Sequence, residues 1–149
     1  MTAVTFSERD LASMVGRRFP GGTYAITPWR AWLTNDVVLA PQGGEHAHPV
    51  FVFIAATSAM GVSWDELFAW FGATAADGPL FGDCDIEIAR PLLVGGEYRV
   101  EGLVYAAERK QGRRAGVFDL VRYRLELHDG ADGPAAVCRN SIVFPRRTR

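Results

Sequence analysis

Residues 49–72 read PVFVFIAATSAMGVSWDELFAWFG, and this stretch decides the fold. From Val50 to Met60 the residues are apolar on nearly every helical face, so a helix here has to be enclosed on all sides by the rest of the protein. Small residues such as Ala55 and Ala56 allow a sheet to approach one side closely. Gly61 is a poor residue for a helix interior and a good helix stop. We therefore predict a central helix over 50–60 that is wrapped by a sheet.

A second helix is predicted over 64–71, closed by Gly72. Ser63 suits the N-cap position, and Glu66 follows three residues later, at the spacing of a capping box. Asp65 and Glu66 also suit the positive end of the helix dipole. For residues 50–54 the alternative is a buried strand, because β-branched and aromatic residues favour strands and periodicity does not exclude one.

The second half of the chain alternates with period two. Apolar residues alternate with charged ones near 83–88, 98–104, 118–127 and 135–144, and turn residues separate these segments. A short strand is predicted at 23–27, followed by a short helix over 28–34 with Thr27 as N-cap and Pro28 at the first position. The pattern predicts one α+β domain, residues 1–149, in which an antiparallel sheet of about five strands bends strongly around one apolar helix.

Composition limits the function classes. The chain has 149 residues, is 48% hydrophobic and carries a net charge of −1, so binding of a polyanion is not indicated. The sequence RRTR at 146–149 is predicted to be a solvated tail. Cys84 and Cys138 lie far apart, without metal-ligand spacing, and are predicted to be buried thiols in a reducing compartment. No signal-peptide pattern or membrane-spanning apolar run is found, so we expect a cytoplasmic protein.

The loop over 35–48 carries the polar groups of greatest interest, because loops held by a rigid scaffold often carry ligand chemistry. It contains Asp36 and His48 and runs directly into the central helix. Gly43 and Gly44 would allow the loop to fold back and bring these two side chains together. The alternative is that Asp36 only ends the short helix region and that His48 caps or packs against the central helix.

The order of these elements resembles the hotdog fold and, more specifically, the MaoC-like dehydratase family. The chain also resembles the N-terminal-type domain of this family, which is found in fatty-acid-synthase-type dehydratases and in two-subunit (R)-specific enoyl-CoA hydratases. The motifs that carry the resemblance are VGRRF at 15–19, YAIT at 24–27, HPVF at 48–51, RPLLVGG at 90–96 and RNSIV at 139–143. The resemblance covers most of the chain. It implies a fold that dimerises by joining two sheets.

The resemblance also implies a reaction. Members of this family add water to a trans-2-enoyl thioester, or remove it from the (R)-3-hydroxyacyl form, using an Asp and a His. Backbone N–H groups near the start of the central helix hold the thioester oxygen. The substrate is carried on coenzyme A or acyl carrier protein, and no other cofactor and no metal are expected. Active members carry Asp-x-Asn-Pro-x-His before the central helix, whereas this chain has NDVVLA at 35–40, and its histidines come ten and twelve residues after Asp36.

This departure favours a subunit that shapes the acyl pocket while a hotdog partner, in a homodimer or heterodimer, supplies the catalytic pair. Asp36 and His48 are the candidates for catalysis in this chain itself. Two other functions stay open. One is a hotdog acyl-CoA thioesterase in which Asp36 or Asp65 activates water. The other is a non-catalytic, cone-shaped α+β protein of the cyclase-like kind that binds a ring-shaped ligand.

Four residues are candidates for binding substrate. Trp32 and Phe51 are candidates for lining the acyl site, together with the other tryptophans, which include Trp64. Arg90 and Arg113 are candidates for binding the phosphates of coenzyme A, because a guanidinium fork suits phosphate oxygens. The alternatives are core packing for the aromatic residues and cross-strand pairing with acidic residues for the arginines.

Overall fold

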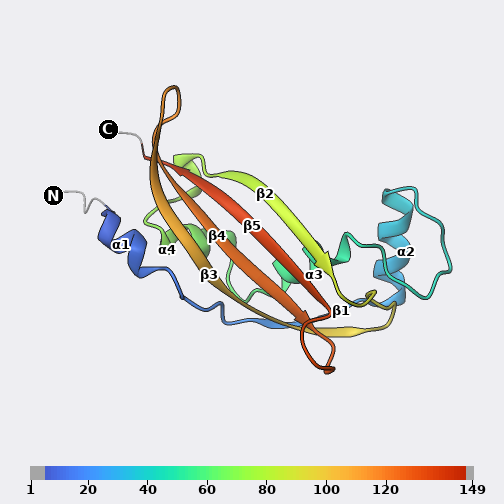
Figure 1. Cartoon of the computed structure of the whole chain (residues 1–149). Helices are drawn as coiled ribbons and strands as arrows, with labels where there is room; N and C mark the ends of the chain where they lie inside the picture. Colours follow the sequence, from blue (N-terminus) through green and yellow to red (C-terminus); the bar gives the residue numbers. More distant parts are fainter. Residues whose placement is uncertain (1–5, 147–149) are drawn as a thin grey trace.

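A computed structural model describes residues 6–146. In chain order the elements are α1 (Glu8–Ser13), β1 (Gly22–Ala25), α2 (Pro28–Val37), α3 (Phe51–Ser58), α4 (Trp64–Trp70), the 3-10 turn η1 (Ala75–Asp77), β2 (Leu80–Ile88), β3 (Glu97–Gly112), β4 (Gly116–His128) and β5 (Ala136–Pro145). The five strands form one antiparallel sheet in the order β1-β3-β4-β5-β2. Figure 1 shows α3 and α4 behind the sheet and α2 beyond one end of it.

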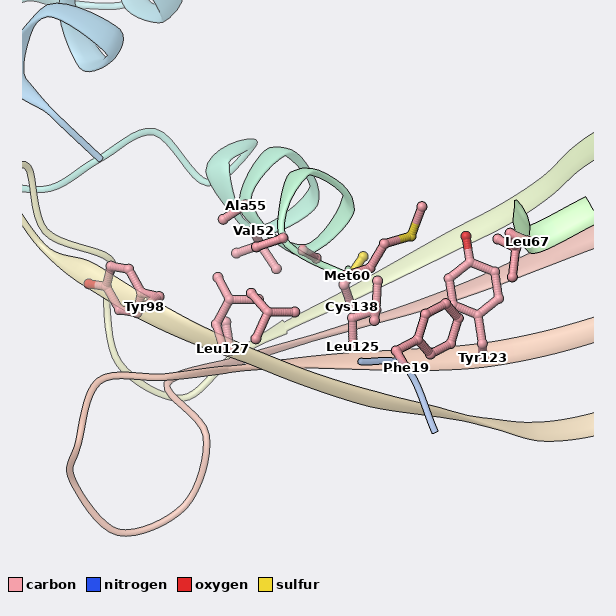
Figure 2. Close-up of a cluster of buried hydrophobic side chains, with 14 of the residues drawn as sticks. Phe19, Val52, Ala55, Met60, Leu67, Tyr98, Tyr123, Leu125, Leu127 and Cys138 are labelled. Atoms are coloured by element: carbon pink, nitrogen blue, oxygen red, sulfur yellow. The ribbon is translucent and has the colours of Figure 1, made fainter. Parts of the chain in front are cut away.

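The predicted central helix is present as α3, so the alternative of a strand over 50–54 is wrong. Val52 and Ala55 are fully buried, and Figure 2 shows them on the side of α3 that faces the sheet. The helix ends before Gly61, which has a φ of +83°. A Cβ at this position would lie 2.6 Å from the carbonyl oxygen of Gly21, so both the left-handed backbone and the close approach require glycine.

The second helix, α4, begins with the predicted capping box. The backbone N–H of Glu66 donates to Ser63 Oγ at 3.2 Å, and the backbone N–H of Ser63 donates to Glu66 Oε2 at 2.7 Å. Leu67 is fully buried, and the ring of Phe71, which follows the helix, stacks on Phe144 of β5 with centroids 5.3 Å apart. Helix α4 therefore covers the end of the sheet that α3 does not reach.

The chain by itself covers only one side of α3, which corrects the prediction that this helix is enclosed on all sides. Phe53 and Ile54 are only partly buried. The neighbouring strand β2 is exposed along its whole length, and within residues 6–146 it pairs only with β5. The register places Phe81, Ile86 and Ile88 on the inner face of the sheet, where Phe81 is still 47% exposed. We call the uncovered surface the open face; it consists of Phe53, Ile54, Phe81, Ile86 and Ile88.

A buried carboxylate ties distant parts of the chain to the sheet. Asp119 of β4 is fully buried and accepts hydrogen bonds from Arg109 Nε and Arg146 Nε, both at 2.7 Å. Arg146 also donates to the carbonyl oxygen of Phe71 at the end of α4. The prediction of a solvated tail is therefore wrong for Arg146, while residues 147–149 lie outside the described part of the chain.

A strained residue, Leu39, lies two positions after the end of helix α2 and gives a testable prediction. Leu39 has a φ of +54° and is 92% exposed. A left-handed conformation costs a non-glycine residue about 1–2 kcal/mol, whereas glycine costs roughly 0.5–1 kcal/mol of extra chain entropy. Leu39→Gly should therefore raise the free energy of unfolding in urea by about 0.5 kcal/mol. The neighbouring Val38→Gly, at a φ of −93°, should lower it. Equal losses for the two variants would contradict the strain.

Candidate functional site

An apolar pocket of about 200 Å³ lies between α4 and the beginning of β2. Trp64 and Phe68 are one helical turn apart in α4 and therefore share a face. Phe81 lies opposite Ile142 of β5 on the inner face of the sheet. The complete lining is Trp64, Phe68, Pro79, Leu80, Phe81 and Ile142, so no charged side chain takes part. Because Phe81 belongs to both, the pocket adjoins the open face, and Phe53 contacts the edge of the Phe81 ring at a centroid distance of 5.8 Å.

The pocket contains only one of the aromatic residues named from the sequence, which is Trp64. Trp32 lies on α2 and is 58% exposed, and Phe51 is buried against the ring of Tyr24 at 6.5 Å. Their roles in substrate binding stay predictions. The missed residue Phe68 carries a sequence signal, because it follows Trp64 by four positions in a predicted helix. That Phe68 faces β2 and lines a pocket depends on tertiary packing, which no local pattern specifies.

Asp36 and His48 come from two different elements. Asp36 is exposed in the last turn of α2, and His48 is partly buried just before α3. The connecting loop folds back as its glycines suggested, because Gln42 Nε2 donates to the carbonyl oxygen of Trp32 at 3.0 Å. Among residues 6–146, however, no hydrogen bond or ion pair joins Asp36 to His48. Their joint role in catalysis stays a prediction.

His48 instead caps the start of α3. Its Nδ1 accepts a hydrogen bond from the backbone N–H of Val50 at 3.1 Å. The next two N–H groups, of Phe51 and Val52, donate to the carbonyl oxygens of His48 and Pro49, each at 3.0 Å. Free N–H groups at a helix start can bind an anion or a polarised carbonyl. Here the first three are already used within the chain.

Arg90 holds the turn between β4 and β5. Its Nε and Nη2 donate to the two carboxylate oxygens of Asp129 at 3.0 and 2.8 Å, and it also donates to the carbonyl oxygens of Asp132 and Gly133. Asp129 lies in the turn after β4, so this ion pair is not the cross-strand pairing that was predicted for the arginines. The expected cross-strand pairing is made by another arginine, Arg139 of β5, which pairs with Asp85 and Glu87 of β2. Arg99 pairs with Glu101 of its own strand, β3.

The predicted substrate-binding residues do not gather at one place. Arg113 lies in the exposed turn between β3 and β4. In Figure 1 this turn is at the opposite end of the sheet from α2, which carries Trp32. Contact of Arg90 or Arg113 with a phosphate group stays a prediction.

The Arg90 ion pair makes acid stability depend on Asp129. The hydrogen bonds from Arg90, with a smaller contribution from the N–H of Ala131, lower the pKa of Asp129 to about 2. A carboxyl group whose pKa is lowered by folding stabilises the fold above its unfolded pKa of about 3.9, and this contribution is lost as the pH falls through about 2. Arg90→Gln should return the pKa of Asp129 toward its ordinary value in an NMR titration. Arg99→Gln, which removes another surface pair, should leave it unchanged. An unaltered pKa in Arg90→Gln would contradict the assignment.

In the part of the chain that the structure describes, no three His, Cys, Asp or Glu residues are grouped so that they could hold a metal ion. None of the helices described here is long and apolar enough to cross a bilayer.

Comparison with known proteins relates the chain to solved structures. No family model and no curated protein sequence matches it. One chain of the ChsH1–ChsH2 complex from Mycobacterium tuberculosis superposes with a TM-score of 0.70 at 14% identity, over 95% of this chain and 93% of that one. The HadBC (3R-hydroxyacyl-ACP dehydratase) complex from the same organism gives a TM-score of 0.67 at 12% identity, over 87% and 96% of the two chains. The chain has the hotdog fold.

The R-hydratase PhaJ1 from Pseudomonas aeruginosa shares this hotdog fold, with a TM-score of 0.56 at 15% identity over 89% of this chain and 83% of that one. The predictions of an α+β class and a sheet wrapped around a central helix are confirmed. The hotdog fold excludes the cone-shaped alternative. At these low identities the similarity concerns the fold, and any activity has to be argued from the site.

Proposed function

We propose that this chain is a subunit of an (R)-specific enoyl-thioester hydratase or 3-hydroxyacyl-thioester dehydratase. Its substrate is an acyl group carried on coenzyme A or acyl carrier protein. The observation that carries the proposal is the apolar pocket beside the open face, lined by Trp64, Phe68 and their neighbours. A pocket without charged groups suits a flexible hydrocarbon chain. The hotdog fold supports the reaction class, because similar structures include an R-hydratase and a 3R-hydroxyacyl-ACP dehydratase.

In this proposal a second hotdog subunit covers the open face. Strand β2 is an edge strand whose outer backbone groups are available to another strand. Phe81 on its inner face contacts the partly buried Phe53 of α3 at a ring-centroid distance of 5.8 Å, and the exposed Ile86 and Ile88 follow along the same face of the strand. Contiguous apolar surface of this kind marks an interaction site. The partner is a second copy or a different hotdog chain, and two of the similar structures are complexes named for two components.

The catalytic groups come from a different hotdog chain, because a second copy would carry the same residues as this one. Hydration needs a base that takes a proton from water while the oxygen attacks C3 of the enoyl group, and donors that stabilise negative charge on the thioester oxygen. In this chain Asp36 and His48 are not joined, and the first N–H groups of α3 are used by His48 and Pro49. We therefore assign acyl binding to this chain, and proton transfer and oxygen binding to its partner.

The test compares hydration of crotonyl-CoA and longer enoyl-CoAs by the chain alone and by the chain mixed with a hotdog subunit that has an intact Asp-x-Asn-Pro-x-His motif. We expect at most trace hydration by the chain alone and activity in the mixture. The control is the same mixture with the partner's motif His replaced. Strong activity of the chain alone that disappears in Asp36→Asn or His48→Gln would contradict a catalytic partner.

The same assay distinguishes a thioesterase from a hydratase, because thioester hydrolysis releases a free thiol and hydration does not. A putative thioesterase from Pseudomonas putida KT2440 has a similar fold, with a TM-score of 0.54 at 14% identity over 83% of this chain and 70% of that one. Thiol release without loss of the enoyl group would favour hydrolysis over the proposed reaction.

Filling the pocket should change the preferred acyl length. Leu80 lines the pocket but is exposed, so Leu80→Trp adds volume there without disturbing the buried core. In the active mixture we expect a loss of about tenfold or more in kcat/KM for long enoyl chains, equivalent to about 1.4 kcal/mol, with crotonyl-CoA little affected. Leu93→Trp is the control, because Leu93 is also exposed but lies outside the pocket lining. Equal losses for short and long chains would argue against an acyl pocket.

A further inference from the structure

The two cysteines lie side by side, although their separation in the sequence suggested otherwise. The Sγ atoms of Cys84 in β2 and Cys138 in β5 are 3.6 Å apart. The strand register places Cys84 opposite Asn140 and Ile86 opposite Cys138, so the two thiols are diagonal neighbours on the inner face of the sheet. The prediction of two buried thiols holds only for Cys138, because Cys84 is exposed.

The two thiols differ in reactivity. Cys138 is fully buried beneath α3, where Figure 2 shows it on the inner face of the sheet. Burial, with the nearby Cys84 as a second cause, raises the pKa of Cys138 to about 12. Its thiol also contacts Asn140 Oδ1 at 3.4 Å. A reagent in solution therefore meets the exposed Cys84 first. The raised pKa keeps Cys138 protonated and slow to react with reagents in solution, so its attack on an adduct at Cys84 depends on the short distance between the two sulfurs.

A bond between these sulfurs needs a small movement of strand β2. An S–S bond is about 2.05 Å long, so the sulfurs have to approach by about 1.5 Å from their separation of 3.6 Å. Among the described residues β2 forms strand pairs with β5 alone, and the pairing is already irregular between Phe81 and Cys84. An edge strand bound on one side shifts more easily than a strand paired on both sides.

We propose that Cys84 and Cys138 form a redox site that closes into an intrachain disulfide with a small disulfide oxidant such as oxidised glutathione. The Cys84 thiolate attacks one glutathione sulfur, which forms a mixed disulfide and releases one glutathione thiolate. The Cys138 sulfur then attacks Cys84, forms the intrachain bond and releases the second glutathione. The two protein thiol protons end on the two released glutathione molecules, so two protein thiols are oxidised as one glutathione disulfide is reduced.

This bond would fix β2 to β5 beside the open face. Because Cys84 lies on the same face of β2 as Ile86, a subunit bound there would shield it, so the reaction belongs to the unpaired chain. The inference does not require hydratase activity. Its test counts thiols and masses, and therefore succeeds or fails independently of the hydration assay.

The experiment incubates the purified chain with excess oxidised glutathione over a dilution series and follows intact mass and free thiols. The wild type should lose both thiols and two hydrogen atoms, run as a single chain without reductant, and recover with dithiothreitol. Cys138→Ser should stop at one glutathione adduct on Cys84, and Cys84→Ser should not react in the folded state. A wild type that keeps a glutathione adduct, links two chains, or stays unreacted at every dilution would overturn the proposal. Thiol counts in guanidinium provide the reference for complete reaction.

Discussion

Asp119→Asn is expected to lower the free energy of unfolding by about 3–5 kcal/mol, the usual cost of breaking a buried ion pair from one side. Asp119 is fully buried and binds both Arg109 and Arg146. The neutral amide would leave two largely buried guanidinium groups without their counter-charge. It would also weaken the hold of Arg146 on the end of α4, where it donates to the carbonyl oxygen of Phe71.

Urea denaturation of the variant measures this loss directly. Asp85→Asn is the matched control, because Asp85 also pairs with an arginine, Arg139, but its side chain is 75% exposed. An exposed pair contributes at most about 1 kcal/mol. If the Asp119 and Asp85 variants lost the same small amount, the buried network would not have the stabilising role described above.

Phe53→Asp is expected to weaken association with the second hotdog subunit by a hundredfold or more, about 2.7 kcal/mol. Phe53 stands on the uncovered side of α3 and contacts the edge of the Phe81 ring. In the complex an aspartate at this position would be buried among apolar side chains without a partner, which is costly. In the free chain the site is only partly buried, so the fold should survive.

Sedimentation velocity over a concentration series measures the association, and circular dichroism checks the fold of each variant. Val15→Asp introduces the same charge at an apolar residue that is 46% exposed, beyond α1 and outside the open face. It should leave association unchanged. Unaltered association of a folded Phe53→Asp protein would show that the open face is not the contact surface.

Local sequence patterns predicted most of the secondary structure. The helix stop at Gly61, the capping box at Ser63 and Glu66, and the period-two strands are present as expected. Each of these features depends on neighbouring residues, so a local pattern is sufficient. Helix α2 ends at Val37, whereas the predicted helix ended at Thr34. No residue between these two positions gives a strong stop signal, so the sequence did not mark the true end.

Tertiary relationships were less accessible. The pocket joins α4 to β2, and the thiol pair joins β2 to β5, across separations that no local pattern encodes. The composition of the central helix predicted a complete cover, whereas this chain covers the helix only in part. A local pattern could not indicate this difference, because uncovered apolar residues and core residues look alike in the sequence.

The most direct test of the account is the molar mass of the purified protein in solution, measured by light scattering. We predict two hotdog subunits: either twice the mass of this chain, or the sum of this chain and a hotdog chain that co-purifies with it. A stable single chain that stays monomeric at high concentration, and also in the presence of a hotdog subunit with an intact Asp-x-Asn-Pro-x-His motif, would contradict the claim that a partner completes the site.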